Sequence, residues 1–333
     1  MKPRIAFATC LILAGTVELA RAEDGEKPGV FSFLLENDTF ADSDKYYTNG
    51  VKLSYLAPDD PLPSWLDPVD RMGRPVYGDE ARVRWGFAIG QSLYTPSDTS
   101  LTVPDPTDRP YAAWLYGALS LVAYSEGESI DTIELHMGVV GPSALGEEVQ
   151  NGFHDLINDG EAQGWDYQLE DEFGIMVLAE HRWVSQTLID FDSGLGLDFS
   201  PHVGIALGNV QTYAAAGAML RFGQNLSSDF GAPRIRPALS GSAFFDGTQD
   251  FAWYVFAGVE GRAVAQDIFL DGNTFSDSPP SVDKNWLVGD VQAGVSLILY
   301  GTRITYSYVH RTEEFEGQEE AAEFGAISIS RSF

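Results

Sequence analysis

Apolar and polar side chains alternate along the chain in segments of about 9–13 residues, with polar, glycine-rich or proline-rich stretches between them. A period of two is the pattern of a β-strand with one apolar and one polar face. Strands in most globular proteins run to only ~5–6 residues, so segments this long predict strands that cross a membrane in an antiparallel barrel. The apolar faces include Val51, Leu53, Tyr55 and Ala57; Trp85, Phe87, Ile89 and Leu93; Ile133, Leu135, Met137 and Val139; Trp253, Val255, Ala257 and Val259; and Ile304, Tyr306 and Tyr308.

The pattern contains twelve to fourteen candidate strands, and it is weakest over residues 184–222. We predict twelve, because closed single-chain barrels usually hold an even number of strands. The chain ends on Phe333, and a terminal aromatic residue is typical of the last strand of such barrels. The connections expected to be loops are 58–79, 97–109, 141–171 and 267–285. The sequence therefore predicts one all-β domain, a transmembrane antiparallel barrel over residues 23–333.

Residues 1–22 have the pattern of a secretory signal peptide. Lys2 and Arg4 precede a short apolar run, and Ala20-Arg21-Ala22 offers a small-x-small cleavage site. The run is shorter than the ~20 residues that a membrane-spanning helix needs. No later stretch approaches that length either, so any membrane span would be made of strands. We expect cleavage before Glu23 and an outer-membrane location in a Gram-negative cell.

Cleavage would leave an acidic chain without cysteine. Residues 1–22 hold three of the 20 basic and one of the 49 acidic residues, so the mature charge is 17 − 48 = −31. This balance argues against nucleic acid as a partner. The single cysteine, Cys10, lies within the leader, which excludes disulfides and thiol chemistry in the mature chain.

A short helix is predicted after the strand that ends at Gly141-Pro142. It carries Gln150 and His154 at i and i+4, so both side chains lie on one helix face. A polar helix beside a strand end indicates a site, whereas a structural histidine is the alternative. His136, on the polar face of the preceding strand, is a weaker candidate of the same kind.

The first two strand ends form a second candidate site. Asn37-Asp38 closes the first strand, and Thr48-Asn49 opens the second, with an acidic connection between them. Carboxylate, amide and hydroxyl oxygens that converge at one rim suit a hard cation such as Ca²⁺. The alternative is an Asx-rich hairpin turn with a purely structural role.

Motifs of common hydrolases and nucleotide enzymes are missing from the sequence. It has no G-x-S-x-G, no H-E-x-x-H, no P-loop and no dinucleotide fingerprint. If the protein is an enzyme, water activated by a histidine is therefore a more plausible nucleophile than a serine or a cysteine.

The chain resembles the outer-membrane lipid A 3′-O-deacylases. The shared motifs are collinear over residues 37–169, and they are specific because several occur in order. They are Asn37-Asp38, Tyr47-Thr48-Asn49-Gly50, Gln91-x-x-Tyr94-x-Pro96, Asp108-Arg109-Pro110-Tyr111-Ala112, Gly138-x-x-Gly141-Pro142, Gly146-x-x-Val149-Gln150-Asn151-x-x-His154 and Gly164-Trp165-x-x-Gln168-Leu169.

The resemblance implies a twelve-stranded barrel with a calcium-dependent esterase site near its outer rim, acting on lipid A of lipopolysaccharide. Carried over by motif, His154 is the general base and Gln150 orients water or substrate. Asn37 and Asp38 take the oxyanion and calcium roles, and Thr48 belongs to the same pocket. These assignments make the protein a carboxylic ester hydrolase.

One departure affects the substrate. The family carries a lysine in the loop after the third strand, and residues 96–101 here contain no basic residue. A different lipid A, or another acyl ester, therefore stays open as the substrate. Two other functions stay open as well: a non-catalytic structural or pore-forming barrel, and a phospholipase acting on glycerophospholipids.

Overall fold

The computed structural model describes residues 28–41, 46–125, 129–157, 160–184, 186–191, 194–229, 231, 245, 250–276 and 279–333. The expected leader, 1–22, and the acidic residues Asp42 and Asp44 lie outside them. Within the described residues, no helix is both long and apolar enough to cross a bilayer.

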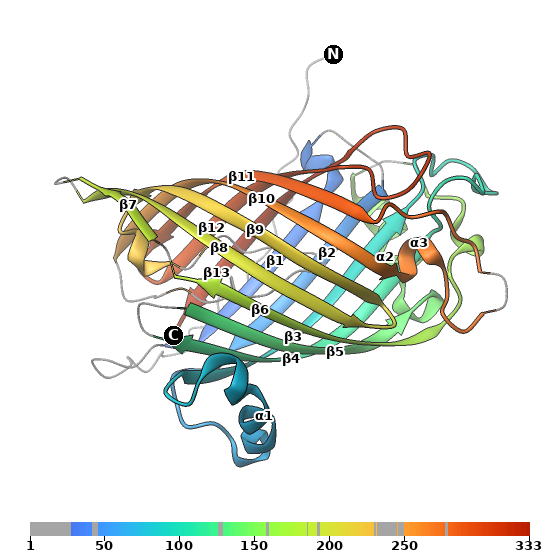
Figure 1. Cartoon of the computed structure of the whole chain (residues 1–333). Helices are drawn as coiled ribbons and strands as arrows, with labels where there is room; N and C mark the ends of the chain where they lie inside the picture. The colour runs from blue at the N-terminus through green and yellow to red at the C-terminus, as the bar shows by residue number, and fades with distance from the viewer. Residues whose placement is uncertain are drawn as a thin grey trace.

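Thirteen strands form one antiparallel sheet that closes on itself (Figure 1). In chain order the elements are β1 (Val30–Asn37), η1 (Asp38–Ala41), β2 (Tyr46–Leu56), η2 (Ser64–Leu66), α1 (Asp67–Tyr77), β3 (Arg82–Thr95), β4 (Ala112–Ser125), β5 (Ser129–Val140), η3 (Pro142–Ala144), α2 (Gly146–Ile157), η4 (Trp165–Tyr167), β6 (Glu172–Trp183), β7 (Gln186–Asp190), β8 (Leu195–Gly208), β9 (Gln211–Gln224), η5 (Leu226–Ser228), β10 (Phe251–Asp267), α3 (Ile268–Asp271), β11 (Leu287–Leu299), β12 (Thr302–Arg311) and β13 (Ala322–Ser332).

The closed barrel has twelve strand positions, as predicted. β1 pairs with β13, and β6 pairs with β8, which completes the ring. β7 also pairs with β8, further along it: Arg182 of β6 lies opposite His202, and Gln186 of β7 lies opposite Phe199. β6 and β7 are thus two parts of one interrupted strand, which explains why the sequence pattern is weak from residue 184.

The predicted loops lie between strands as expected, but two of them hold helices that were not predicted, α1 and α3. Residues 97–109, 141–171 and 267–285 connect strands at one end of the barrel, here called the loop end, and 141–171 holds the predicted helix, α2. Residues 58–79 lie at the opposite end, where β1 begins and β13 ends, here called the terminal end, and contain a helix, α1.

The two faces of the barrel wall differ as a membrane-spanning barrel requires. Apolar side chains stand exposed on the outside; among them are Phe31, Leu53, Phe87, Ile89, Met137, Ile175, Val203, Val255, Val291 and Ile304. Their sequence neighbours point inward and are mostly polar and buried. Closure leaves no free sheet edge, so the backbone polar groups are paired within the wall.

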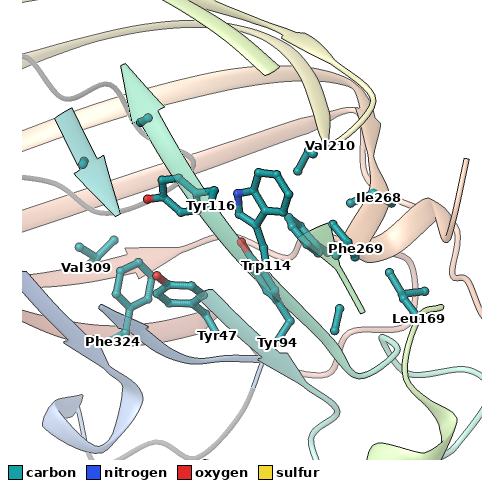
Figure 2. Packing of buried hydrophobic residues seen from close by; sticks show 14 residues of the cluster. Tyr47, Tyr94, Trp114, Tyr116, Leu169, Val210, Ile268, Phe269, Val309 and Phe324 are labelled. Atoms are coloured by element: carbon teal, nitrogen blue, oxygen red, sulfur yellow. The ribbon is translucent and has the colours of Figure 1, made fainter. Parts of the chain in front are cut away.

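Side chains fill the interior of the barrel. Near the loop end, Tyr47, Tyr94, Trp114 and Phe269 belong to one buried cluster, in which the Tyr94 and Phe269 rings stack 4.2 Å apart (Figure 2). Toward the terminal end, Phe245 lies buried against the guanidinium of Arg303. These two clusters argue against the alternative of a pore-forming barrel.

Buried ion pairs link neighbouring strands on the inner face of the wall, as Arg221 of β9 and Asp198 of β8 do. Arg221 makes two hydrogen bonds to Asp198, from Nε to Oδ1 (3.0 Å) and from Nη2 to Oδ2 (2.6 Å). Both side chains are almost fully buried. Removing one partner of a buried pair leaves an uncompensated charge, which costs far more than losing an exposed pair.

We therefore expect Asp198→Ala to lower the free energy of unfolding by about 3–5 kcal/mol. The matched control is Asp59→Ala, which removes the partner of the exposed Arg82 at 3.5 Å and should cost less than about 1 kcal/mol. Urea unfolding in lipid vesicles, followed by tryptophan fluorescence, measures both. Equal losses would contradict a structural role for the interior pair.

Candidate active site

The predicted site residues from both halves of the motif meet in one pocket. Its lining includes Asn37, Asp38, Thr48, Gln150 and His154. All five are at least nine-tenths buried. The remaining lining comes from Thr39, Asn49, Leu93, Val149 and Phe153.

The pocket lies on the outside of the barrel wall at the loop end. Asn37 lies six residues after the outward-facing Phe31, and residues an even number apart share one face of a strand. Asn37 pairs across the sheet with Asn49. Leu93 follows Ile89 and Phe87 in the same way on β3. The helix α2 covers these strand ends from outside, so the pocket lies between the wall and the helix.

A β-bulge in β2 places Thr48. In the pairing with β3, Tyr47 lies opposite Tyr94 and Asn49 lies opposite Leu93, so Thr48 is the extra residue. In a regular strand, residues two apart face the same side. Here Tyr47 joins the interior cluster while Asn49 lines the outer pocket. The bulge thus turns the strand end toward the site.

Hydrogen bonds fix Asn37 across the hairpin. Its Nδ2 donates to the backbone carbonyl of Thr48 (2.9 Å), and its Oδ1 accepts from Thr39 N (2.9 Å). The second bond is an Asx turn, so the structural alternative for this motif is also present. The Thr48 hydroxyl in turn bonds the Thr95 hydroxyl at 2.6 Å.

His154 is held by a backbone carbonyl. Its Nδ1 lies 2.5 Å from the oxygen of Gly160. A carbonyl only accepts, so Nδ1 carries the proton, and in the neutral ring Nε2 is then the acceptor. The other four histidines each face a carboxylate: His136 with Glu134, His181 with Asp131, His202 with Glu260 and His310 with Glu323.

His136, the weaker candidate, does not join the pocket. It is buried inside the barrel, with Nε2 2.9 Å from Glu134, and its ring stacks on Tyr116. A structural role therefore accounts for this residue.

Gln150 is oriented by Trp165, which sequence reasoning placed in a motif without assigning it a role. Trp165 Nε1 donates to Gln150 Oε1 at 2.8 Å. This contact fixes which end of the amide is the donor, and Gln150 Nε2 has no hydrogen-bond partner among the described residues. The amide NH₂ is therefore available to a bound molecule. The only sequence signal for Trp165 was the Gly164-Trp165 pair itself.

Close packing against the wall holds α2 in place. Trp165 and Ala144 are buried with Ala113 of β4 and Leu93 of β3. Gln91 Nε2 donates to the carbonyl of Ala144 at 2.6 Å. Before the helix, Gly141 has φ +105°, and a Cβ there would lie 2.6 Å from the backbone of Glu170. Three of the motifs thus serve to seat one helix.

The part of the pocket formed by β1, η1 and β2 is lined by side chains that carry oxygen atoms, and Asp38 supplies the carboxylate among them. Within the described residues, no group of three or more His, Cys, Asp or Glu side chains is placed to hold a metal ion. A cation bound here would take one carboxylate together with amide, hydroxyl, backbone and water oxygens. That donor set fits a hard cation such as Ca²⁺.

Known proteins similar to this chain were found in two of three comparisons. The model of the family described as outer membrane protein LpxR matches residues 5–333. LpxR from Salmonella typhimurium is similar in structure, with 23% identity, a TM-score of 0.75 and coverage of 91% of this chain and 100% of that one. The β domain of the Bordetella autotransporter BrkA gives 12% identity, a TM-score of 0.45 and coverage of 92% and 100%. No curated protein sequence matches.

A substitution at Gly146 tests how α2 is seated. A Cβ at this position would meet the Trp165 ring at 2.5 Å and Ala113 Cβ at 2.7 Å. We expect Gly146→Ala to cost about 1–3 kcal/mol by overpacking and to speed hydrogen exchange of the α2 amides. Gly152→Ala, in the same helix with open space around its Cβ, is the control and should leave exchange unchanged or slower. Equal exchange in both variants would argue against this contact.

Proposed function

The chain belongs to the outer membrane protein LpxR family, and from that premise we propose that it is an acyl-ester hydrolase that deacylates lipid A. The reaction removes the 3′-linked acyloxyacyl chain from the lipid A of lipopolysaccharide. The observation that carries the proposal is the position of His154 in a pocket between the outer barrel wall and α2. The backbone carbonyl of Gly160 fixes the orientation of its imidazole ring.

The place of the pocket supports a substrate in the outer leaflet. In bacterial outer-membrane barrels, the long loops are extracellular and the periplasmic turns are short. The loop end carries α2 and α3, whereas β11 and β12 are joined at the terminal end by Tyr300-Gly301 alone. We orient the loop end outward, which puts the pocket beside the lipopolysaccharide leaflet. The apolar side chains of Leu93, Val149 and Phe153 line one side of it.

His154 acts as the general base. Its Nε2 takes a proton from a water molecule, whose oxygen attacks the ester carbonyl carbon. The tetrahedral intermediate then collapses, and the bond between the acyl carbon and the sugar oxygen breaks. The imidazolium returns its proton to the departing sugar oxygen. The products are the free acid and a 3′-hydroxyl. The Gly160 carbonyl keeps the ring in the correct tautomer throughout.

Gln150 and Asn37 supply hydrogen-bond donors around the carbonyl. Gln150 Nε2, set by Trp165, orients the water or the substrate. Asn37 Nδ2 uses one hydrogen on the Thr48 carbonyl, and the second is available to the oxyanion. Donors already fixed before the reaction stabilise developing charge without reorganisation. Thr48 contributes through the carbonyl that positions Asn37.

Asp38 is the residue proposed to hold Ca²⁺, with neutral oxygens of the Asn37–Thr48 hairpin as further ligands. A bound divalent cation stabilises negative charge on a carbonyl oxygen. Asp38 is 1% exposed, and burial near a cation site favours a ligand role over a surface role.

The acidic loop after β3 leaves the exact acyl substrate open. Ser100 Oγ, together with Ser100 N, donates to Asp98 and lowers the pKa of that carboxyl below its usual value. The next basic residue along the chain, Arg109, is buried, paired with Glu314 at 3.3 Å and placed over the Tyr94 ring. It therefore does not replace the missing lysine. A lipid A without a phosphate at that loop, or another acyl ester, suits these contacts better.

We expect His154→Ala to reduce deacylation by about 10²–10⁴-fold while the barrel still folds. The control is His310→Ala, which changes a half-exposed histidine paired with Glu323 and should keep full activity. Mass spectra of lipid A from cells expressing each variant measure the loss of the acyl chain, and heat-modifiable gel mobility checks folding. Full activity of a folded His154→Ala would exclude this mechanism.

Removal of calcium should abolish the reaction reversibly. A chelator added to wild-type protein is expected to stop deacylation, and added Ca²⁺ to restore it, because the oxyanion loses a positive partner. Asp38→Asn should behave as the chelated enzyme and resist rescue. Activity that persists in chelator would remove calcium from the mechanism, and release of lysophospholipid instead of a lipid A product would reassign the substrate.

A further inference from the structure

The helix α1 packs against the lipid-facing side of the barrel wall. Leu66 and Tyr77 are buried in one cluster with Val83 of β3 and Leu121 of β4. Val83 shares its face of β3 with the exposed Phe87 and is paired across the sheet with Ala123, two residues from Leu121. Figure 1 shows the helix outside the wall, beneath β3 and β4. It therefore occupies space that lipid would otherwise fill.

A second apolar stripe on the same helix points away from these contacts. It consists of Val69, Met72 and Val76, which are 40%, 79% and 56% exposed, and it is extended by Trp65 of the preceding turn η2, which is 59% exposed. The spacing of three and four between the helical residues places them along one line of α1. Asp70, Arg71 and Arg74 lie on the other side of the helix, so α1 is amphipathic and part of its apolar surface is uncovered.

The stripe continues an aromatic row on the barrel. Trp65 contacts Trp85 edge to face (6.3 Å between ring centres), Trp85 contacts Tyr55 (5.8 Å), and Tyr55 stacks on Phe333 (6.1 Å). Aromatic rows of this kind mark the boundary between lipid and water on outer-membrane barrels. Trp65 adds the helix to that boundary.

Polar contacts fix the helix in this pose. Arg74 donates to the backbone carbonyls of Gly78, Asp79 and Ala81, which lead into β3. The Tyr77 hydroxyl donates to Asp70 at 2.9 Å. The stripe is therefore presented by a rigid element.

We propose that α1 is an interfacial helix whose stripe of Trp65, Val69, Met72 and Val76 inserts into the phospholipid leaflet on the periplasmic side of the outer membrane. A short amphipathic helix with Trp on its apolar face and Arg on its polar face lies in the plane of the interface. The wall that α1 covers is already the lipid-facing surface, so the same leaflet reaches both. The proposal depends on the membrane placement of the barrel and is independent of its activity.

The test measures where single positions on α1 lie. Met72→Cys and, as the matched control on the polar face, Arg71→Cys are made in the mature chain, which carries no other cysteine. Each is labelled with a nitroxide and reconstituted in phosphatidylethanolamine–phosphatidylglycerol vesicles. Collision rates with oxygen, which concentrates in lipid, and with a water-soluble nickel chelate are measured by electron paramagnetic resonance. Leu53→Cys on the mid-wall and Asp105→Cys in an exposed loop provide the lipid and water standards.

We expect the oxygen-to-chelate ratio at Met72 to shift toward the Leu53 standard, and the ratio at Arg71 to stay near the Asp105 standard. A Met72 label as accessible to the chelate as the Asp105 label would overturn the proposal. Spin–spin broadening at Met72 that grows with the protein-to-lipid ratio would also overturn it, because a second copy would then cover the stripe. All four positions are exposed, so the substitutions leave the packing intact.

Discussion

The closed hydrogen-bonded wall is the constraint on which everything else depends. Inside a bilayer each unpaired backbone polar group is costly, so the sheet must join its first and last strands. β1 with β13 and β6 with β8 complete this ring, and β7 extends the pairing where β6 breaks. Closure gives the strands an apolar outer face and an inner face that carries most of the buried polar side chains. Specialised chemistry is then confined to the ends of the strands, where a bulge or a helix can depart from the pattern.

The candidate site makes use of both departures. The bulge at Thr48 moves one strand end out of register, and Asn37 locks onto its carbonyl. The helix α2 supplies Gln150 and His154 from a loop that crosses the outside of the wall. The pocket needs residues from both the strand ends and α2. The glycines that let α2 pack closely against the wall, Gly141 and Gly146, are therefore as necessary for the site as its polar residues. Because the pocket lies outside the wall, the interior of the barrel can be packed with side chains that stabilise the fold.

The fold was largely predictable from the sequence, because period-two alternation follows directly from the two environments of the wall. The strand count was hardest to predict at the break between β6 and β7, because a broken strand gives two short segments of alternating side chains. The helix α2 was predicted from the spacing of Gln150 and His154. The helix α1 was not predicted, because Pro68, Gly73 and Pro75 are residues typical of loops. The meeting of Asn37 and Thr48 with His154 followed from the resemblance, not from spacing. The role of Trp165 depends on a contact 15 residues away that no local pattern encodes.

The two outer helices stand on the same wall, α1 at one end of β3 and β4 and α2 at the other. β3 has 14 residues, about 46 Å at ~3.3 Å per residue, or roughly 35 Å along the bilayer normal at a tilt of ~40°. On this side the length of exposed apolar wall is set by helices at both ends. The protein is therefore matched to one bilayer thickness on the side that carries the pocket. A thicker or thinner membrane would be met by tilting or by local deformation of the lipid, and either would change the depth of the pocket that His154 lines.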